Sequence, residues 1–151
     1  MRLVAIDPGT TRSAWVALDG RTLVDFGIVD NDDLRLSLRN GALARDVVVI
    51  EKVESFGMAV GAEVFETVHW AGRFAEASLP APVHRIGRKA VKLAVCGSVR
   101  AKDANIRASL IDRYGGAGAT RTGGALHGVS KDVWAALAVA VTFLDGLEGT
   151  A

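Results

Sequence analysis

The stretch that decides the fold is Leu3-Val4-Ala5-Ile6-Asp7-Pro8-Gly9-Thr10-Thr11. Residues 3–6 form a short apolar run, and such a run before Pro-Gly is typical of a buried strand followed by a turn. Asp7 closes this strand, so its carboxylate is expected at one edge of a sheet. Open α/β sheets bind ligands at the carboxyl ends of their strands, which makes Asp7 the first candidate for chemistry.

The segments that follow predict a mixed sheet. Residues 14–18 and 23–29 flank a hairpin signal, which gives an antiparallel meander of three strands. Residues 47–50 are all β-branched and suit a strand covered on both faces. A last strand is expected at 83–86, and helices at 30–45, 59–78, 88–95, 103–114 and from the N-cap Ser130 onward. We predict an α/β fold: a mixed five-stranded sheet, with helices on both faces, in one domain over residues 1–151.

Composition narrows the class of protein. Half of the 151 residues are hydrophobic, which is enough for a sizeable core, and the net charge of +1 excludes a strongly basic, histone-like binder. The single cysteine, Cys96, excludes an intramolecular disulfide and a Cys-only zinc site. We expect a cytoplasmic, intracellular protein without a signal peptide. The apolar run 133–144 is too short to span a bilayer, so no membrane partner is expected.

Two further acids are placed like Asp7. Glu51 ends the second apolar strand, and Asp132 lies in the first turn predicted for the last helix. If the strands at 3–6 and 47–50 are parallel neighbours, their carboxylates emerge at the same edge. Any one of these acids alone could be a solvated turn residue. Together they are the oxygen ligands that suit Mg²⁺ or Mn²⁺, and we predict all three as catalytic metal ligands.

Four segments resemble the RuvC-like Holliday junction resolvases, which have the ribonuclease H-like fold. Asp-Pro-Gly-Thr-Thr at 7–11 is similar to the signature of the first strand, and residues 48–53 resemble the strand with the catalytic Glu. Residues 88–102 resemble the basic segment, and 132–138 the C-terminal catalytic helix. The matches follow in order over residues 3–144. The compact chain is similar to small phage-type members of the class.

The resemblance implies a homodimeric, Mg²⁺-dependent endonuclease of DNA recombination and repair that also accepts Mn²⁺ in place of Mg²⁺. It would resolve four-way junctions by paired nicks. By position, Asp7 would bridge the metals, Glu51 would complete one site and Asp132 would serve the other. The chain departs from the family at Ala135, where a second acid commonly stands three residues after the Asp132 position. Water could fill the gap, metal needs could differ, or a neighbour could assist: Lys131, His127 or Ser130.

The contacts to DNA are predicted from local charge. Residues 85–121 contain nine basic and two acidic residues, an excess that can bind phosphates. Lys92 and Lys102 match the family's basic positions best. The further candidates for DNA binding are Arg88, Lys89 and Arg100.

Three other features have predicted roles. Phe56 could stack on an unpaired base or cover the core, and both interpretations stay open. The inward side of helix 59–78 is predicted from Val64, Val68, Ala71 and Ala75, and its dimer interface from Phe65, Trp70 and Phe74. The glycine-rich stretch 115–128 is expected to be a flexible flap over DNA.

Two other functions compete with the endonuclease. A junction-binding protein without catalysis is suggested by Ala135 and would bind junctions without cutting them. Ile6-Asp7-x-Gly9-Thr10-Thr11 also resembles the first phosphate-binding turn of sugar kinases and actin-like ATPases. Those proteins need two lobes and a second phosphate motif, which this chain lacks, and ATP binding would discriminate them.

Overall fold

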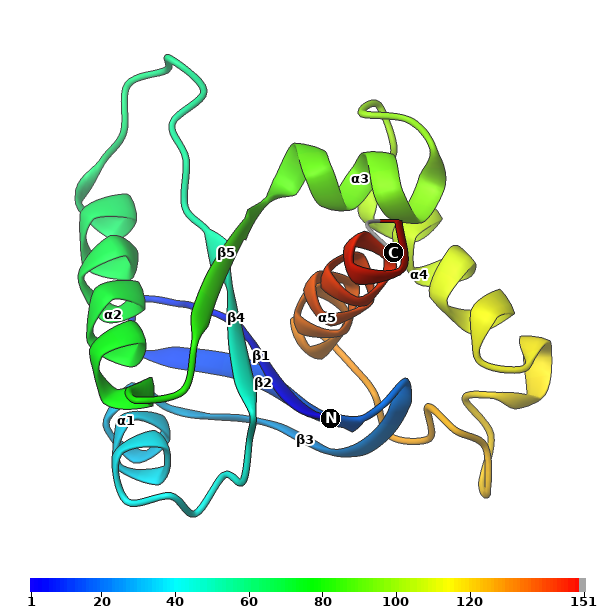
Figure 1. Cartoon of the computed structure of the whole chain (residues 1–151). Helices are drawn as coiled ribbons and strands as arrows, with labels where there is room; N and C mark the ends of the chain where they lie inside the picture. Colours follow the sequence, from blue (N-terminus) through cyan, green and yellow to red (C-terminus); the bar gives the residue numbers. More distant parts are fainter. Residues whose placement is uncertain (150–151) are drawn as a thin grey trace.

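The computed structural model describes residues 1–149. Five strands and five α-helices follow one another, with a short 3₁₀ helix at Gly116–Gly118 (Figure 1). Their bounds are β1 Arg2–Asp7, β2 Arg12–Asp19, β3 Thr22–Asp30, α1 Asn31–Arg39, β4 Val47–Lys52, α2 Ala62–Ser78, β5 Val83–Gly87, α3 Arg88–Cys96, α4 Asp103–Arg113 and α5 Val133–Gly149.

The five strands form one sheet in the order β3-β2-β1-β4-β5. The pairs β1–β2 and β2–β3 are antiparallel, whereas β1–β4 and β4–β5 are parallel. Ile6 lies opposite Ile50 in the parallel pair, so the next residues, Asp7 and Glu51, leave the sheet at the same edge. The predicted mixed five-stranded sheet is confirmed.

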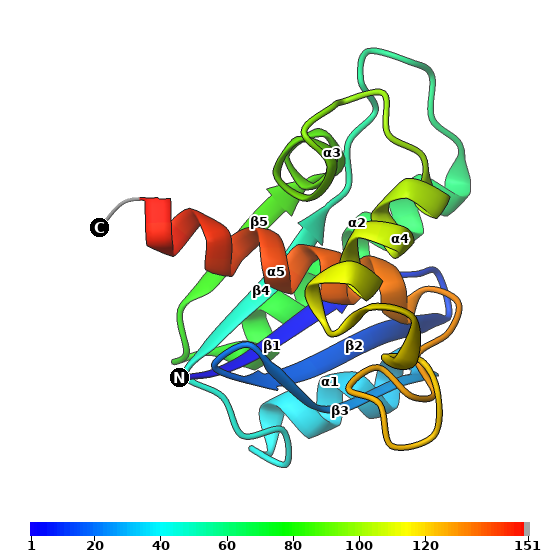
Figure 2. The ribbon, with the colours of Figure 1, turned by 90° about the vertical axis from the view of Figure 1, so that its right-hand side faces the viewer.

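Helices cover both faces of this sheet (Figure 2). Alternate residues of a strand point to opposite faces. Val4 and Ile6 therefore pack with α1 and α2, in a cluster that includes Leu34 and Phe74. Leu3 and Ala5 pack with α3, α4 and α5 on the other face. The second layer carries the larger cluster and is built around α5.

Helix α5 is buried on nearly all sides. Its side chains from Val133 to Thr142 are all buried except that of Ala135, which is half-buried. This explains why the apolar run 133–144 shows no amphipathic pattern. Among residues 1–149, no helix has the length and apolar character needed to cross a membrane.

Three predicted helix bounds are wrong. The helix expected at 30–45 ends at Arg39, since Asn40 caps it and Gly41 turns the chain with φ +79°. Helix α2 begins at Ala62 rather than at 59, after an extended Gly61. Helix α5 begins at Val133, so Ser130 is not its N-cap and Asp132 directly precedes the helix instead of lying in its first turn.

The orientation of α2 also differs from the prediction. Phe74 is completely buried against the sheet, so its predicted place in a dimer interface is wrong. Trp70 is half-buried and packs beside Phe74. Val68 was expected to point inward, yet it is 48 % exposed, and Phe65 is 66 % exposed. Helix α2 carries small and apolar residues of its own on several sides. Its sequence pattern therefore does not show which side faces the sheet.

The glycine-rich stretch is anchored to the core. Ala119 and Leu126 are buried in the larger cluster. The Leu126 amide donates a 2.8 Å hydrogen bond to the Ala119 carbonyl oxygen. Two apolar side chains therefore hold this segment against the core, and its role as a flexible flap over DNA stays a prediction.

Candidate metal centre

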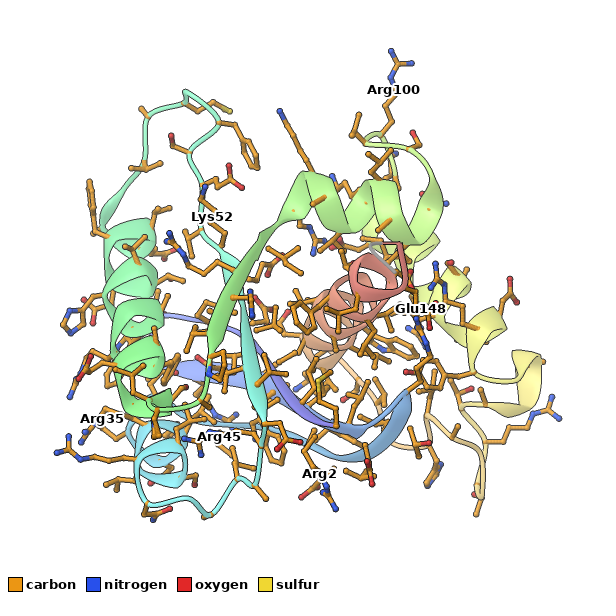
Figure 3. All side chains as sticks on the ribbon, viewed as in Figure 1. Arg2, Arg35, Arg45, Lys52, Arg100 and Glu148 are labelled. Atoms are coloured by element: carbon orange, nitrogen blue, oxygen red, sulfur yellow. The ribbon has the colours of Figure 1, made fainter. Side chains whose placement is uncertain are left out.

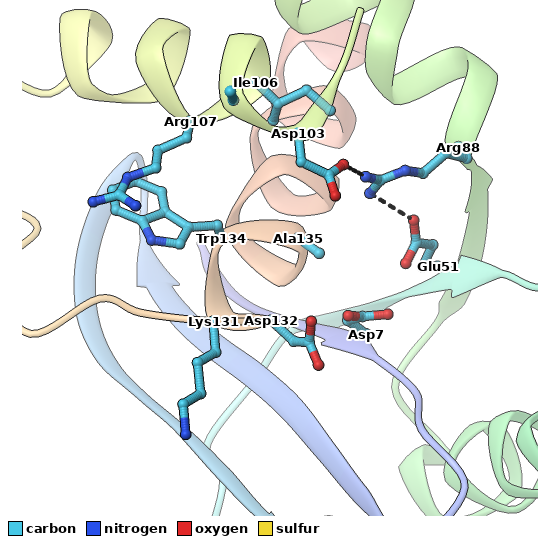
Figure 4. A pocket seen from close by; sticks show the side chains of 11 residues that line it. Asp7, Glu51, Arg88, Asp103, Ile106, Arg107, Lys131, Asp132, Trp134 and Ala135 are labelled. Carbon is cyan, nitrogen blue, oxygen red and sulfur yellow. Dashed lines mark hydrogen bonds and ion pairs between the residues drawn. The ribbon is translucent and has the colours of Figure 1, made fainter.

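The three predicted carboxylates line one open cavity of about 620 Å³. Asp7 comes from the end of β1, Glu51 from β4, and Asp132 from the residue before α5 (Figure 4). The carboxylates of Asp7 and Asp132 point toward each other, and that of Glu51 is turned toward Arg88. The fold therefore brings together residues that are 44 and 81 positions apart.

A buried polar network holds the turn after Asp7 in place. The Gly9 amide donates to the Ser13 hydroxyl oxygen at 3.0 Å, and the Ser13 hydroxyl donates to Asn31 Oδ1 at 2.6 Å. The Asn31 amide donates back to the Gly9 carbonyl oxygen at 2.9 Å. A side chain at Gly9 would collide with the Arg12 carbonyl oxygen, so this turn requires glycine. Ser13 and Asn31 therefore keep Asp7 at a fixed place.

The cavity concentrates negative charge. Burial, the hydrogen bond with Glu51 and the charges of Glu51 and Asp132 raise the pKa of Asp7 to about 9, against a partial offset by Arg88. Without a counter-charge, Asp7 thus keeps a proton that a surface aspartate would lose near pH 4. This is the electrostatic setting in which a divalent cation is stabilising.

A second set of contacts ties the cavity to α3 and α4. Arg88, the first residue of α3, places its Nη1 3.5 Å from Glu51 Oε1. Its Nη2 forms an ion pair with Asp103, the first residue of α4. Asn105 accepts a hydrogen bond from the Lys102 amide and so caps the same helix end. The guanidinium thus bridges two carboxylates at the rim of the site (Figure 4).

The donor set suits a hard divalent cation. Carboxylate oxygens are the usual protein ligands of Mg²⁺ and Mn²⁺, and burial together with the neighbouring carboxylates raises the pKa of Asp7. Within the described part of the chain, no three acidic, histidine or cysteine side chains are already arranged to hold an ion. Glu51 lies between two partners, since its carboxylate hydrogen-bonds with Asp7 and also faces Arg88.

Of the two auxiliary candidates, Lys131 lines the cavity and His127 does not. Lys131 and Ala135 line the cavity. His127 is exposed, does not line the cavity, and places Nδ1 3.5 Å from the Thr120 carbonyl oxygen. Ala135 has no side-chain oxygen, so the cavity wall lacks a carboxylate at this position.

The basic residues predicted to contact DNA lie on α3 or between α3 and α4, whose first residues, Arg88 and Asp103, line the cavity. Lys102 directly precedes α4, and Lys92 is half-buried on α3. Arg100 projects from the loop between these helices (Figure 3). Lys89 places Nζ 5.0 Å from the ring centre of Phe56, whose side chain is 50 % exposed. Phe56 is therefore a loop aromatic, not a cover of the core, and its role in DNA binding stays a prediction.

Four site residues had no sequence-based role. Asp103 and Arg107 line the cavity, with the Arg107 guanidinium 5.0 Å above the Trp134 ring. Ser13 and Asn31 stabilise the Asp7 turn. Asp103 follows Lys102 in the basic segment and was counted only as a charge. No local pattern marks these residues, because each acts through an element distant in sequence.

Comparison with solved structures identifies the fold. Thermus thermophilus RuvC matches all of this chain and 98 % of its own, with a TM-score of 0.71 and 18 % identity. The fold is that of RuvC. A second structure, T. thermophilus RuvC in complex with Holliday junction substrate, matches with a TM-score of 0.72, 19 % identity and the same coverage. No protein-family model and no curated protein matches the sequence. The RuvC-like, ribonuclease H-like fold predicted from the four motifs is confirmed.

Proposed function

We propose that the protein is a divalent-cation-dependent endonuclease that resolves four-way DNA junctions. The observation that carries this proposal is the convergence of Asp7, Glu51 and Asp132 in one cavity of a RuvC fold. The structure of RuvC with a Holliday junction supports branched DNA as the partner. An intracellular protein acting on nucleoid or phage DNA follows from this activity.

The proposed reaction is phosphodiester hydrolysis. One P–O bond forms to a water oxygen and one P–O bond to the leaving oxygen breaks, while a proton passes from the water to the leaving oxygen or to solvent. A divalent cation held by Asp7, Glu51 and Asp132 would polarise the phosphate and lower the pKa of a water molecule. The protein's own contribution is to fix the three carboxylates on separate elements and to surround them with cations.

DNA binding is assigned to the basic elements beside the cavity. Lys92, Lys102 and Arg100 lie on α3, before α4 and in the loop between them, and form no ion pair within residues 1–149. Cations without partners can replace counterions on a phosphate backbone. Phe56, beside Lys89, offers an exposed ring for an unpaired base.

The homodimer is assigned to the exposed side of α2. Phe65, Val68 and Gly72 form a stripe at helical spacing, and the space beside Gly72 is open. Glu66 and Arg73 flank this stripe on one side. In an antiparallel, two-fold α2 pair that crosses near residue 69, Phe65 of one copy lies over Gly72 of the other, and Glu66 faces Arg73. A dimer with two sites would make the paired nicks.

Next to this stripe lies a second hollow of about 580 Å³ between α1 and α2. We call it the arginine groove, and the residues that define it are Arg35, Arg39, His69, Arg73 and Glu76. None of its three arginines forms an ion pair within residues 1–149, and Arg35 Nε is buried without a hydrogen-bond partner. Unpaired cations beside the apolar stripe favour an acidic partner surface, which Glu66 of a second copy provides.

Junction cleavage tests the proposal directly. The full chain is incubated with a labelled four-way junction and with linear duplex, in Mg²⁺, in Mn²⁺ and in chelator. We expect paired nicks in the junction only, and only with a divalent cation. Cleavage by Asp7→Asn at the wild-type rate would contradict the assigned site.

The alternative is a junction-binding protein without catalysis, and Ala135 is the observation that favours it. Tight junction binding without cuts in any divalent cation would establish this alternative. Absence of both binding and cleavage would refute both functions, and ATP binding would then test the sugar-kinase-like alternative.

A further inference from the structure

The wall of the cavity lacks a carboxylate at position 135, where a site for two divalent cations would need a further ligand. Asp7, Glu51 and Asp132 supply the carboxylates, and Ala135 supplies only a methyl group one turn into α5. Mg²⁺ and Mn²⁺ are held by oxygen ligands, and two such ions share at least one carboxylate between them. Asp103 is a fourth carboxylate of the lining, but Asp103 and Glu51 are both paired with Arg88, so few ligands remain for a second ion.

The cavity already contains a positively charged side chain, that of Arg88. The Arg88 guanidinium is held between Glu51 and Asp103, and its side chain is only 29 % exposed. The contacts to these carboxylates use Nη1 and Nη2. Because a guanidinium carries five N–H donors in a planar fork, donors remain for a phosphate oxygen.

The charges of the side chains that line the cavity also favour a single divalent cation. Four acidic and three basic side chains line the cavity, so its net charge is −1 when all are ionised. One divalent cation and one phosphodiester bring this total to zero. A second divalent cation would leave two uncompensated positive charges in a partly buried space, where like charges repel more strongly than in water.

We propose that the cavity holds a single divalent cation and that Arg88 supplies the second positive charge to the scissile phosphate. Arg88 is then a catalytic residue, and Asp103 is a positioning residue that keeps the guanidinium at the rim. This inference rests on the proposed nuclease function. It assigns to Arg88 a role in phosphate stabilisation that differs from general DNA attraction.

Cation stoichiometry tests the number of ions. Binding of Mn²⁺ to the full chain without DNA is followed by the electron paramagnetic resonance of free Mn²⁺. The order of junction cleavage in Mg²⁺ is measured at saturating protein. We expect one Mn²⁺ per chain and a Hill coefficient near one, and in Ala135→Asp a second Mn²⁺ and a coefficient that rises toward two. Two ions per wild-type chain, or a coefficient near two, would overturn the inference and leave the nuclease function intact. No binding together with no cleavage would refute both.

Arg88→Ala tests the role of the guanidinium. We expect single-turnover cleavage at saturating protein to fall by about 10²-fold, the effect of removing a preorganised electrostatic donor. Mn²⁺ affinity should stay the same or rise, because a positive charge next to Glu51 is gone. A residue that only positioned the metal would instead lower Mn²⁺ affinity. Cleavage by Arg88→Ala at the wild-type rate would overturn the inference.

Two further variants complete the comparison. Arg21 is a matched control, since it also bridges two carboxylates, Asp145 and Glu148, but lies outside the cavity. Arg21→Gln should leave the cleavage rate within about two-fold, in line with an exposed ion pair. Asp103→Asn should lower the rate with unchanged junction affinity, and Asp103→Glu should restore most of it. Equal rates in Asp103→Asn and wild type would remove the positioning role.

Discussion

The carboxylate cavity and the arginine groove are hollows of similar size, about 620 and 580 Å³, with opposite electrostatic character. In the cavity, the sheet and α5 hold carboxylates close together, and Arg88 and Asp103 form ion pairs at its rim. In the groove, three arginines on two surface helices have no acidic partner within residues 1–149.

The difference teaches what each region lacks. Rigid strand ends can hold like charges together, although their repulsion lowers the stability of the fold. A small bound cation can remove this repulsion without any movement of the backbone. The arginines of the groove lie on helix surfaces, where Arg39 is exposed and Arg35 and Arg73 are half-buried, so a partner can reach them. The first region therefore calls for a metal ion, and the second for an acidic surface of another molecule.

Asp7→Asn should produce the largest effect and the sharpest contrast between activity and stability. Junction cleavage should fall by at least about 10³-fold, because a carboxylate of the metal site is lost. Stability in chelator should rise instead, because folding of wild type must protonate the buried Asp7 carboxyl, whereas an amide needs no proton. Single-turnover cleavage and urea unfolding of the same preparation measure both effects. Junction affinity serves as the control and should be unchanged, whereas a fall in stability would mean that the carboxylates do not repel one another.

The pH dependence of stability should show the cost of ionising the buried Asp7 in the wild-type chain. The pKa of Asp7 is about 9 in the folded chain and near 4 when unfolded, so the folded state binds this proton more tightly. Stability from this group is present at low pH and is lost as pH rises toward 9.

Urea unfolding in chelator between pH 5 and 9 measures this loss, which we expect to be on the order of 5 kcal/mol. Saturating Mg²⁺ should reduce the slope, and Asp7→Asn should flatten it. A wild-type profile in chelator as flat as that of Asp7→Asn would show that Asp7 is ionised without a cation.

Charge reversal on α2 should weaken the proposed homodimer beside the arginine groove. Glu66→Lys and Arg73→Glu each place like charges together twice in the antiparallel pair, and each should weaken the homodimer by about 30-fold. A mixture of the two variants should restore the dimer, because every facing pair is then opposite in charge.

Sedimentation equilibrium measures these dimers, and Arg12→Glu, on β2, is an exposed control outside α1 and α2. Homodimers of either variant with wild-type strength would exclude the antiparallel α2 arrangement. Failure of the mixture to associate would exclude the pairing of Glu66 with Arg73.

Lys102→Ala should give the smallest effect. Loss of one phosphate contact should weaken junction binding a few-fold and lower the slope of log affinity against log salt by about one. The metal site is untouched, so cleavage at saturating protein should stay close to that of wild type. Fluorescence anisotropy over a salt series measures the slope, and an unchanged slope would remove Lys102 from the DNA contacts.

The two regions also differ in how far the sequence predicted them. The cavity's carboxylates were found because Asp7 and Glu51 end apolar strands, and strand ends can be recognised locally. The bridge from Glu51 through Arg88 to Asp103 was missed, because it joins residues of three elements whose packing no local pattern encodes. The arginine groove was missed for the same reason, since Arg35 and Arg73 lie on separate helices.

The order of strands and helices, the mixed sheet, and the acids that end β1 and β4 could all be predicted from the amino-acid sequence. Hydrophobic periodicity and turn residues act over a few positions, so these features are written locally. Three features became visible only in the folded chain: which side of α2 faces solvent, the packing of the glycine-rich segment on the core, and the contact of Arg88 with Glu51. These depend on how whole elements pack, and packing is settled by the sum of many weak contacts between residues distant in the chain.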